Sequence, residues 1–275
     1  MSDTEMVNFA RRVPEVVPFA PDAVLLQEVV QSSAARVAQL LRNTTGFGFE
    51  VAVEPGPEAV VGNEGRHIVV RNTAVLLNRR TMSLRGQSGV FATRYLVRDA
   101  APGVRPRIKE HAHCLAETAS GNMRVAIAGV HFVTDGRFAA RTMGPCYKAK
   151  WARQLAAFLP SRYPRGPVPQ VWVIGGDFNN RRCAGARETV RCDVMPFWHV
   201  LTQQSDFGDA VFERYGHSQQ ALSAQTRRGR RVDYVFVRGR VFDASHDVDY
   251  DLRRGEPGFY SDHRLLWALV GPGSS

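Results

Sequence analysis

The stretch Val173-Ile174-Gly175-Gly176-Asp177-Phe178-Asn179 is the most informative part of the chain. An apolar run that ends in an acid and an amide is typical of a buried strand whose polar residues lie where the chain leaves the sheet. The same pattern occurs in Leu25-Leu26-Gln27-Glu28, in Ile127-Ala128-Gly129-Val130-His131 and, ahead of the last expected strand, in Ser261-Asp262-His263. Because a buried carboxylate is costly without a cation or a donor, acids that converge at sheet edges indicate a hard divalent metal ion.

The order of the expected elements predicts an α/β fold with two packed mixed β-sheets flanked by helices. Successive strands without long helices between them favour this arrangement over a doubly wound sheet. A length of 275 residues without internal repeats predicts one domain, residues 1–275, with a core at about 20–270. Strands are expected at 23–27, 47–53, 67–70, 74–77, 90–97, 107–116, 123–131, 170–174, 232–237 and 263–270, and helices at 9–19, 33–41 and 147–159.

The net charge of +10 comes almost wholly from arginine, because lysine occurs only at Lys109, Lys148 and Lys150. The planar guanidinium matches phosphate oxygens, so this excess favours a phosphate-bearing or polyanionic partner. A genome biased toward arginine codons would produce the same excess, and both explanations stay open. The Arg-rich stretches 181–193 and 216–231 are expected to be substrate-facing loops, with a merely solvated surface as the alternative.

The cysteines and the first residues bear on the cellular compartment. Cys183 and Cys192 could close a loop disulfide if the protein is exported, whereas Cys114 is expected to be a core thiol. The start of the chain shows no signal-peptide pattern, which predicts a cytoplasmic protein, and secretion stays open if the sequence continues upstream. No apolar run reaches the ~20 residues that span a bilayer.

The strand-end motifs resemble the markers of the endonuclease/exonuclease/phosphatase superfamily, the deoxyribonuclease-I-like hydrolases. They occur in the family's order between Asp22 and Leu269, and together they are far more specific than any one of them alone. The resemblance implies a four-layer sandwich and hydrolysis of phosphoester bonds. The matching segments are Gln27-Glu28, Gly176-Asp177-Phe178-Asn179, Val232-Asp233-Tyr234-Val235 and Ser261-Asp262-His263.

The resemblance also implies a metal site and a way to activate water. Glu28 and Asp262 would hold Mg²⁺, with Mn²⁺ as a possible substitute, and the ion would polarise a phosphate oxygen. Asp177 and Asn179 would orient or deprotonate the attacking water. In isolation each acid has an ordinary structural explanation, such as a turn former or a solvated strand end, and only their joint occurrence favours catalysis.

Two histidines complete the implied catalytic set. Asp233 would hold His263 in one tautomer, and His263 would contact the phosphate or act as the base in place of Asp177. His131 matches the family's histidine strand. Strict alternation along residues 107–116 places Glu110 toward the core, so we expect a Glu110–His131 pair.

The same alternation places His111 and His113 on the surface, with Arg107 and Lys109. The resemblance departs at the start of the chain, where family members have a strand with a metal-binding asparagine. Asn8 stands too close to Glu28 to match that asparagine. Either the sequence continues upstream or a strand is lost, and the second case predicts an exposed sheet edge and weaker metal binding.

Three functions are compatible with these residues. A nuclease is favoured because the run 227–231, Arg-Arg-Gly-Arg-Arg, precedes Asp233 and would contact backbone phosphates of nucleic acid. A phosphoinositide or sphingolipid phosphodiesterase is the alternative within the class, with Pro196-Phe197-Trp198 as the one candidate for an exposed apolar loop. The alternative from another class is a catalytically impaired nucleic-acid-binding module. We expect a monomer.

Overall fold

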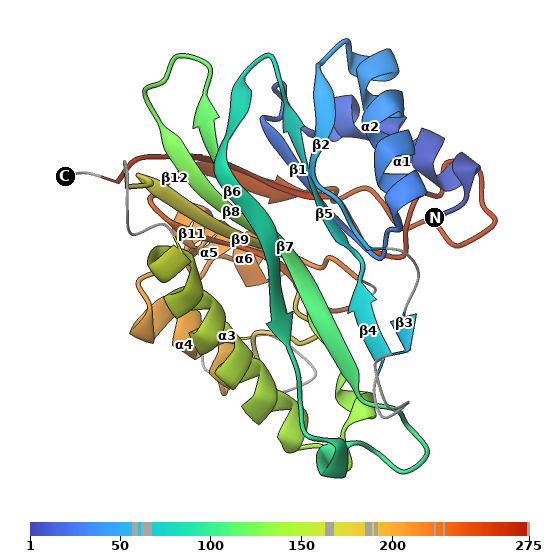
Figure 1. Ribbon diagram of the computed structural model, residues 1–275, viewed down its shortest axis with the longest axis vertical. Helices are drawn as coiled ribbons and strands as arrows, with labels where there is room; N and C mark the ends of the chain where they lie inside the picture. Colours follow the sequence, from blue (N-terminus) through green and yellow to red (C-terminus); the bar gives the residue numbers. More distant parts are fainter. Residues whose placement is uncertain are drawn as a thin grey trace.

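The computed structural model describes residues 1–56, 60–61, 68–162, 168–184, 189, 192–222, 224–227 and 229–273 (Figure 1). The helices are α1 (Asp3–Val16), α2 (Gln31–Thr45), α3 (Met143–Arg162), α4 (Pro196–Gln204), α5 (Ala210–Tyr215) and α6 (Gln219–Leu222), with short 3-10 turns at Val97–Asp99 and Asp135–Arg137. The strands are β1 (Ala23–Gln27), β2 (Phe49–Val53), β3 (Val60–Val61), β4 (Ile68–Arg71), β5 (Thr73–Asn78), β6 (Met82–Thr93), β7 (Arg107–Thr118), β8 (Arg124–His131), β9 (Val171–Asp177), β10 (Gly208–Asp209), β11 (Asp233–Arg238), β12 (Arg240–His246) and β13 (Leu266–Gly271).

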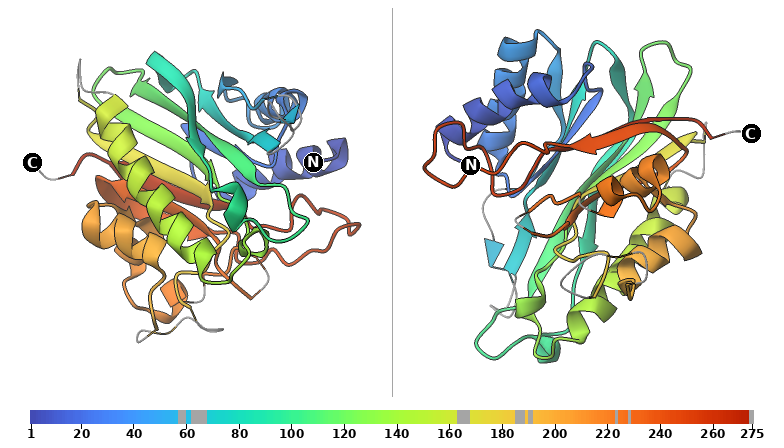
Figure 2. Two further views of the ribbon diagram at one scale, coloured as in Figure 1. Left: turned by 60° about the horizontal axis from the view of Figure 1, so that its bottom comes forward. Right: turned by 180° about the vertical axis from the view of Figure 1, so that it is seen from behind.

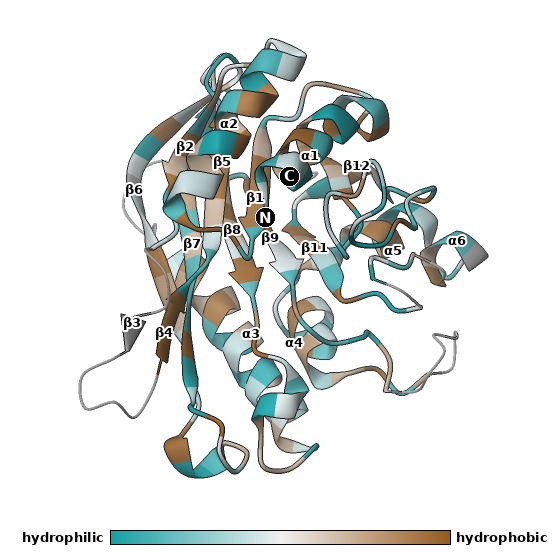
Figure 3. Ribbon diagram, turned by 90° about the vertical axis from the view of Figure 1, so that its right-hand side faces the viewer, coloured by the Kyte–Doolittle hydropathy of each residue, from teal (hydrophilic) through white to brown (hydrophobic). Residues whose placement is uncertain are grey.

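Two β-sheets pack face to face between two pairs of helices, and β12 and β13 form a separate two-stranded sheet. The larger sheet has the order β10-β11-β9-β8-β7-β4-β3, with β6 also paired to β7, and the smaller has the order β1-β5-β2. Figures 1 and 3 show α1 and α2 on the side of the smaller sheet and α3 and α4 on the side of the larger one. Separate apolar clusters fill the space under each helix pair and between the sheets. The predicted four-layer α/β sandwich is therefore confirmed.

The apolar stripes of the helices explain how the layers hold together. α2 buries Ala34, Val37, Ala38 and Leu41, the residues predicted from its period, and ends at the left-handed Gly46. α1 begins earlier than expected, because Ser2 and Glu5 form a capping box ahead of its buried stripe. Since Met6, Ala10 and Val13 on α1 are buried in the core, that core starts before the predicted boundary near residue 20.

One edge of the smaller sheet is open. In the described part of the chain β1 pairs only with β5, and β13 pairs only with β12. Asn8 lies on α1, where its side-chain amide donates to the Phe259 carbonyl at 2.8 Å, so it is part of a structural contact.

Figure 2 shows the N-terminus beside α1 and the C-terminus beyond β13. In the part of the chain that the structure describes, no helix is long and apolar enough to cross a bilayer.

The sequence pattern missed β12, α4 and the first half of β6. Parts of the two predicted Arg-rich loops, at 185–188, 190–191, 223 and 228, lie outside the described residues.

Candidate active site

Three neighbouring strands of the larger sheet bring three predicted residues into one row. His131 ends β8 and lies in register with Asp177, which ends the parallel strand β9. Asp177 is in turn in register with Asp233, the first residue of the antiparallel strand β11. Gly176 makes this approach possible, because a Cβ at its φ of 135° would lie 2.1 Å from the Val130 carbonyl oxygen. Residues far apart in sequence therefore meet at one end of the sheet.

Asp177 is the most deeply buried acid of this row, with 4% of its surface exposed. Its Oδ1 accepts a hydrogen bond from the Asn179 backbone N–H at 2.6 Å. Burial and the nearby carboxylate of Asp233 raise the pKa of Asp177 to about 7. This carboxyl group is therefore able both to take up and to release a proton near neutral pH.

His263 lies against Asp233, as the resemblance implied. Its Nδ1 is 2.8 Å from Asp233 Oδ2, and its backbone N–H donates to the Ser261 hydroxyl. Burial alone would lower the pKa of His263, but the hydrogen bond and charge of Asp233, together with Asp177, raise it to about 9. His263 is therefore an imidazolium at neutral pH in the metal-free protein.

Glu28 reaches the row from β1 of the other sheet. Its backbone has a φ of 56°, a left-handed conformation that non-glycine residues seldom adopt, and its side chain is 73% exposed. Its Oε1 lies 3.5 Å from His131 Nε2, and the same nitrogen lies 3.8 Å from Asp177 Oδ2. His131 thus stands between one acid from each sheet.

The partner of His131 is Lys109 and not the predicted Glu110. Lys109 is 3% exposed, and its Nζ lies 3.2 Å from His131 Nδ1, with the Asn72 side-chain oxygen 3.3 Å from the same nitrogen. Burial and Arg107 lower the pKa of Lys109 to about 8, so it is mostly an ammonium at pH 7. An ammonium group can only donate, so we infer from the shorter contact that Nδ1 accepts and that the His131 hydrogen is on Nε2, facing the acids. The Asn72 oxygen, which can also only accept, then makes no hydrogen bond to Nδ1.

The expected Glu110–His131 pair is wrong, and so is the surface position of His111 and His113. Glu110 forms an ion pair with Arg71 at 2.5 Å. His111 and His113 are buried, and the His111 ring lies 2.8 Å from the Thr93 hydroxyl and accepts the His131 backbone N–H. The physical reason is that β7 lies in the middle of the larger sheet and is covered on both faces, so alternation does not separate inside from outside.

Lys148 is a second buried lysine that the sequence analysis did not connect to the site. Its Nζ donates to Asp135 Oδ1 and to the Asn179 carbonyl, both at 2.7 Å. The Asn179 side-chain amide donates to the Phe132 carbonyl at 2.8 Å. These contacts hold the turn that follows β9. The rarity of lysine in the sequence could have pointed to these residues. Most cationic residues of the chain are arginines, and two of its three lysines are buried beside the site.

Asp262, a predicted metal ligand, forms an ion pair with an arginine side chain. It is half exposed and accepts a hydrogen bond from Arg227 at 2.6 Å. Two other arginines of the predicted substrate-facing loops are structural, since Arg182 and Arg231 are buried, and Arg231 forms an ion pair with Asp209. For these two the substrate-facing prediction is wrong.

The loop after β9 is closed by a disulfide between Cys183 and Cys192, the pair that we expected for an exported protein. Cys114 is a buried free thiol on β7, as predicted, and burial raises its pKa to about 12. Its burial in the apolar layer between the two sheets gives it no part in the candidate site.

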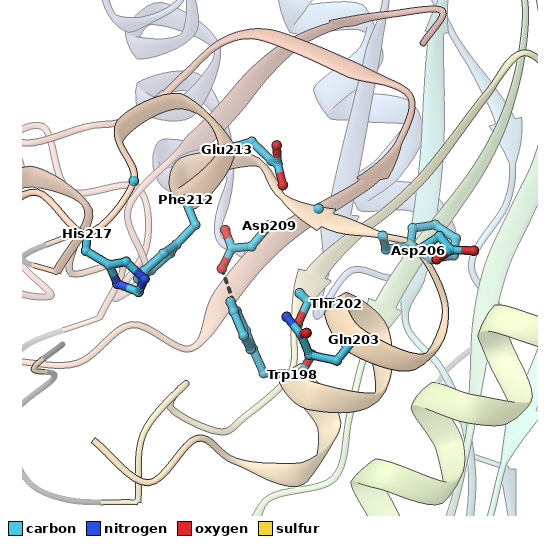
Figure 4. Close-up of a pocket in the computed structure, with 11 residues that line it drawn as sticks. Trp198, Thr202, Gln203, Asp206, Asp209, Phe212, Glu213 and His217 are labelled. Atoms are coloured by element: carbon cyan, nitrogen blue, oxygen red, sulfur yellow. Dashed lines mark hydrogen bonds between the residues drawn. The ribbon is translucent and has the colours of Figure 1, made fainter. Parts of the chain in front are cut away.

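Two cavities lie near the last strands. One, of about 560 Å³, is lined by Asn179 and Val232, the neighbours of Asp177 and Asp233 in the chain. The other, of about 460 Å³, lies between α4, β10 and α5 (Figure 4). There the Trp198 indole points at Asp209 and donates to it at 2.8 Å, and no lining residue in the described chain belongs to the predicted site.

The donor atoms of the row suit a hard divalent cation. One atom each from Asp177, Asp233 and His263 lie within 4.8 Å of one another, the only such group among the described residues. Burial, and after it the Asp233 carboxylate, raises the pKa of Asp177, and a cation nearby would stabilise its ionised form. Carboxylate oxygens are the ligands that Mg²⁺ and Mn²⁺ prefer, so these residues fit such an ion.

Comparisons with known proteins agree with this fold. The sequence profile of the Endonuclease/Exonuclease/phosphatase family matches residues 3–263. No curated protein sequence matches the chain. A protein of that family from Bacteroides thetaiotaomicron superposes with a TM-score of 0.63 at 13% identity, over 97% of this chain and 86% of the other.

Two further solved structures have the same fold. The human Nocturnin catalytic domain with bound sulfate anion gives a TM-score of 0.60 at 17% identity, over 94% of this chain and 84% of that one. D. rerio TDP2 complexed with single strand DNA product gives 0.55 at 12% identity, over 98% of this chain and 92% of that one.

Proposed function

The chain belongs to the endonuclease/exonuclease/phosphatase family, and from this membership and the site geometry we propose that it hydrolyses phosphodiester bonds with a bound divalent metal ion. The observation that carries the proposal is the row of His131, Asp177 and Asp233 on three adjacent strands, with His263 held against Asp233. In this arrangement Asp177 can act as a base, the His263 imidazolium carries a positive charge, and His131 can donate a hydrogen bond. Phosphoryl transfer requires these three kinds of group around one phosphate.

Mg²⁺, or Mn²⁺ in its place, would be held by Glu28 and Asp262, with Asp177 close to it. Asp262 would exchange its ion pair with Arg227 for the metal. The bound ion would neutralise charge on the phosphoryl oxygens and on the leaving oxygen. The exposed carboxylate of Glu28 and the half-exposed carboxylate of Asp262 are both accessible to an ion from solvent.

The protonation states favour Asp177 over His263 as the base. His263, with a pKa of about 9, already carries its proton at pH 7 and donates from Nε2 to a phosphoryl oxygen. Asp177 accepts the proton of the attacking water, and the Asn179 N–H holds its other carboxylate oxygen in place. The Nε2–H of His131 supplies a further donor beside Asp177.

Within this activity we propose a nuclease. The charge of +10 favours a polyanionic substrate, and a protein of the same fold, TDP2, forms a complex with a single strand DNA product. The lipid alternative loses its expected apolar loop, because Phe197 and Trp198 lie on α4, Phe197 is buried among aromatic rings, and Trp198 donates to Asp209.

Product release from three substrates tests the proposal: supercoiled plasmid DNA, a phosphoinositide and bis(p-nitrophenyl) phosphate, each with Mg²⁺. We expect hydrolysis of DNA that Asp177→Ala lowers by a factor of about 10² to 10⁴, the usual worth of a general base. Asp249→Ala, at an exposed acid, is the matched control and keeps full activity. Circular dichroism and thermal unfolding confirm that both variants fold.

Three results would contradict the proposal. Wild-type-like turnover by Asp177→Ala would remove the proposed base. Preferred hydrolysis of the phosphoinositide would favour the lipid-active alternative. DNA binding without hydrolysis by the wild type would favour the binding module.

A further inference from the structure

The cavity beside Asn179 is basic. We call it the arginine cleft, because Arg141, Arg181 and Arg230 line its volume of about 560 Å³. They come from three separate segments: the turn before α3, the turn after β9 and the turn before β11. One acid, Asp135, also lines it, but its carboxylate already accepts from Lys148 at 2.7 Å. The lining therefore carries a clear excess of positive charge.

Two of these arginines have no charge to compensate them. Arg141 and Arg230 are exposed, and the described part of the chain gives neither side chain an ion pair. Other arginines in this region are neutralised, as Arg227 is by Asp262 and Arg231 by Asp209. Uncompensated guanidinium groups facing one concave space attract an anion with planar oxygens, such as a phosphate.

Asn180 is a buried polar residue in the lining of the arginine cleft. It lines the cleft, is only 9% exposed, and its Nδ2 has no hydrogen-bond partner. Its Oδ1 accepts from the Arg181 backbone N–H at 3.0 Å, which fixes the orientation of the amide. A buried donor without an acceptor is costly, so this amide is one polar group near the cleft that the described residues leave unsatisfied.

The arginine cleft is lined by residues next to the catalytic row in the chain, and two contacts hold its sides. Asn179 and Val232 line it, and each is close in sequence to a residue of the row, Asp177 or Asp233. The Lys148 contact with the Asn179 carbonyl fixes one side, and Cys183, which belongs to the disulfide, lines the other. A group bound here would belong to the same substrate molecule as the scissile phosphate.

We propose that the arginine cleft binds a second phosphate of the substrate, next to the one that is hydrolysed. This inference rests on the proposed function and adds to it, because it predicts a preference for substrates with at least two phosphates. A nucleic acid strand meets this requirement through its neighbouring phosphate. A diester with a single phosphate would leave the arginine cleft without its anion.

The test compares two esters that differ only in that phosphate. Thymidine 5′-(p-nitrophenyl phosphate) carries one phosphate, and its 3′-phosphorylated form carries two. We expect kcat/KM to be about tenfold higher for the second, the worth of one charge-assisted hydrogen bond. The double variant Arg141→Gln, Arg230→Gln should lose this preference and change turnover of the singly phosphorylated ester by less than about threefold.

Arg11→Gln, at an exposed arginine of α1, is the matched control and should keep the preference. Equal kcat/KM for the two esters in the wild type, or a preference that survives in the double variant, would overturn the inference. Hydrolysis of both esters at equal rates would still leave the proposed function standing.

A binding experiment decides the inference without turnover. Calorimetry should give thymidine 3′,5′-bisphosphate a dissociation constant about tenfold lower than thymidine 5′-phosphate, and the difference should vanish in the double variant. If neither ester is hydrolysed but the bisphosphate still binds tighter, the phosphodiesterase assignment fails and the arginine cleft stands. Equal binding of the two nucleotides would overturn the cleft as a phosphate site.

Discussion

Replacing Asp233 by asparagine should remove most of the positive charge from His263. In the wild type the Asp233 carboxylate, 2.8 Å from Nδ1, holds the pKa of His263 at about 9 against the effect of burial. Without that charge, burial opposes only the weaker effects of Asp177 and Asp262, and the pKa should fall toward the ordinary value of 6.5. A fall of the His263 pKa from about 9 to 6.5 corresponds to a loss of about 3 kcal/mol in the interaction that favours the protonated ring. Solvent screening reduces it only modestly, because the two side chains are 22% and 11% exposed.

Stability should change in a defined pH window. A histidine whose pKa is raised in the folded state stabilises the protein fully below about 6.5, and that contribution is lost as the pH rises through about 9. Asp233→Asn should therefore unfold more easily than the wild type at pH 6, and the difference should shrink by pH 10. Urea unfolding at the two pH values measures this difference.

The direct assay is an NMR titration of the His263 Cε1–H in metal-free protein with a chelator present. Loss of one resonance in His263→Gln provides the assignment. We expect a midpoint near 9 in the wild type and a clearly lower one, toward 6.5, in Asp233→Asn. A variant midpoint that stays near 9 would refute the reasoning, because the charge on His263 would then have another source.

Three other perturbations test separate parts of the account. Lys109→Met should lower the share of the Nε2–H tautomer of His131, seen in its ring ¹⁵N shifts, and unchanged shifts would contradict the assigned hydrogen bond. Burial lowers the pKa of His111 to about 3 in the folded protein. As the pH falls below 6.5, His111 therefore binds a proton in the unfolded chain but not in the folded one. This difference should lower the free energy of unfolding by ~2 kcal/mol between neutral pH and pH 5. In urea unfolding, His111→Gln should lose less stability than the wild type over the same pH range. Because the disulfide joins residues only nine apart, replacing Cys183 and Cys192 by serine should cost ~2–3 kcal/mol, and an unchanged urea midpoint would show that the bond does not stabilise the fold.

The layered fold and the meeting of distant residues could be predicted from the sequence. Apolar runs that end in polar residues define strand ends, and strands of one sheet bring such ends together. His131, Asp177 and Asp233 lie in register for this reason. The motif glycine Gly176 is required because β9 passes so close to the Val130 carbonyl.

The partners of the site residues could not be predicted in the same way. Alternation assigns inside and outside only when one face of a strand is solvated, and β7 is covered on both faces. Lys109 and Glu110 were therefore assigned to the wrong faces. Arginine content also does not identify substrate contacts, because Arg182 packs over the Trp198 and Phe212 rings inside the fold.

The central claim is that Glu28, at the end of β1, and Asp262, ahead of β13, hold one divalent cation close to Asp177. Anomalous diffraction from crystals soaked in Mn²⁺ tests it most directly. We predict a single strong peak in contact with the Glu28 and Asp262 carboxylates and close to Asp177, and its loss in Glu28→Gln. No peak at that position under saturating Mn²⁺, or an undiminished peak in Glu28→Gln, would contradict it.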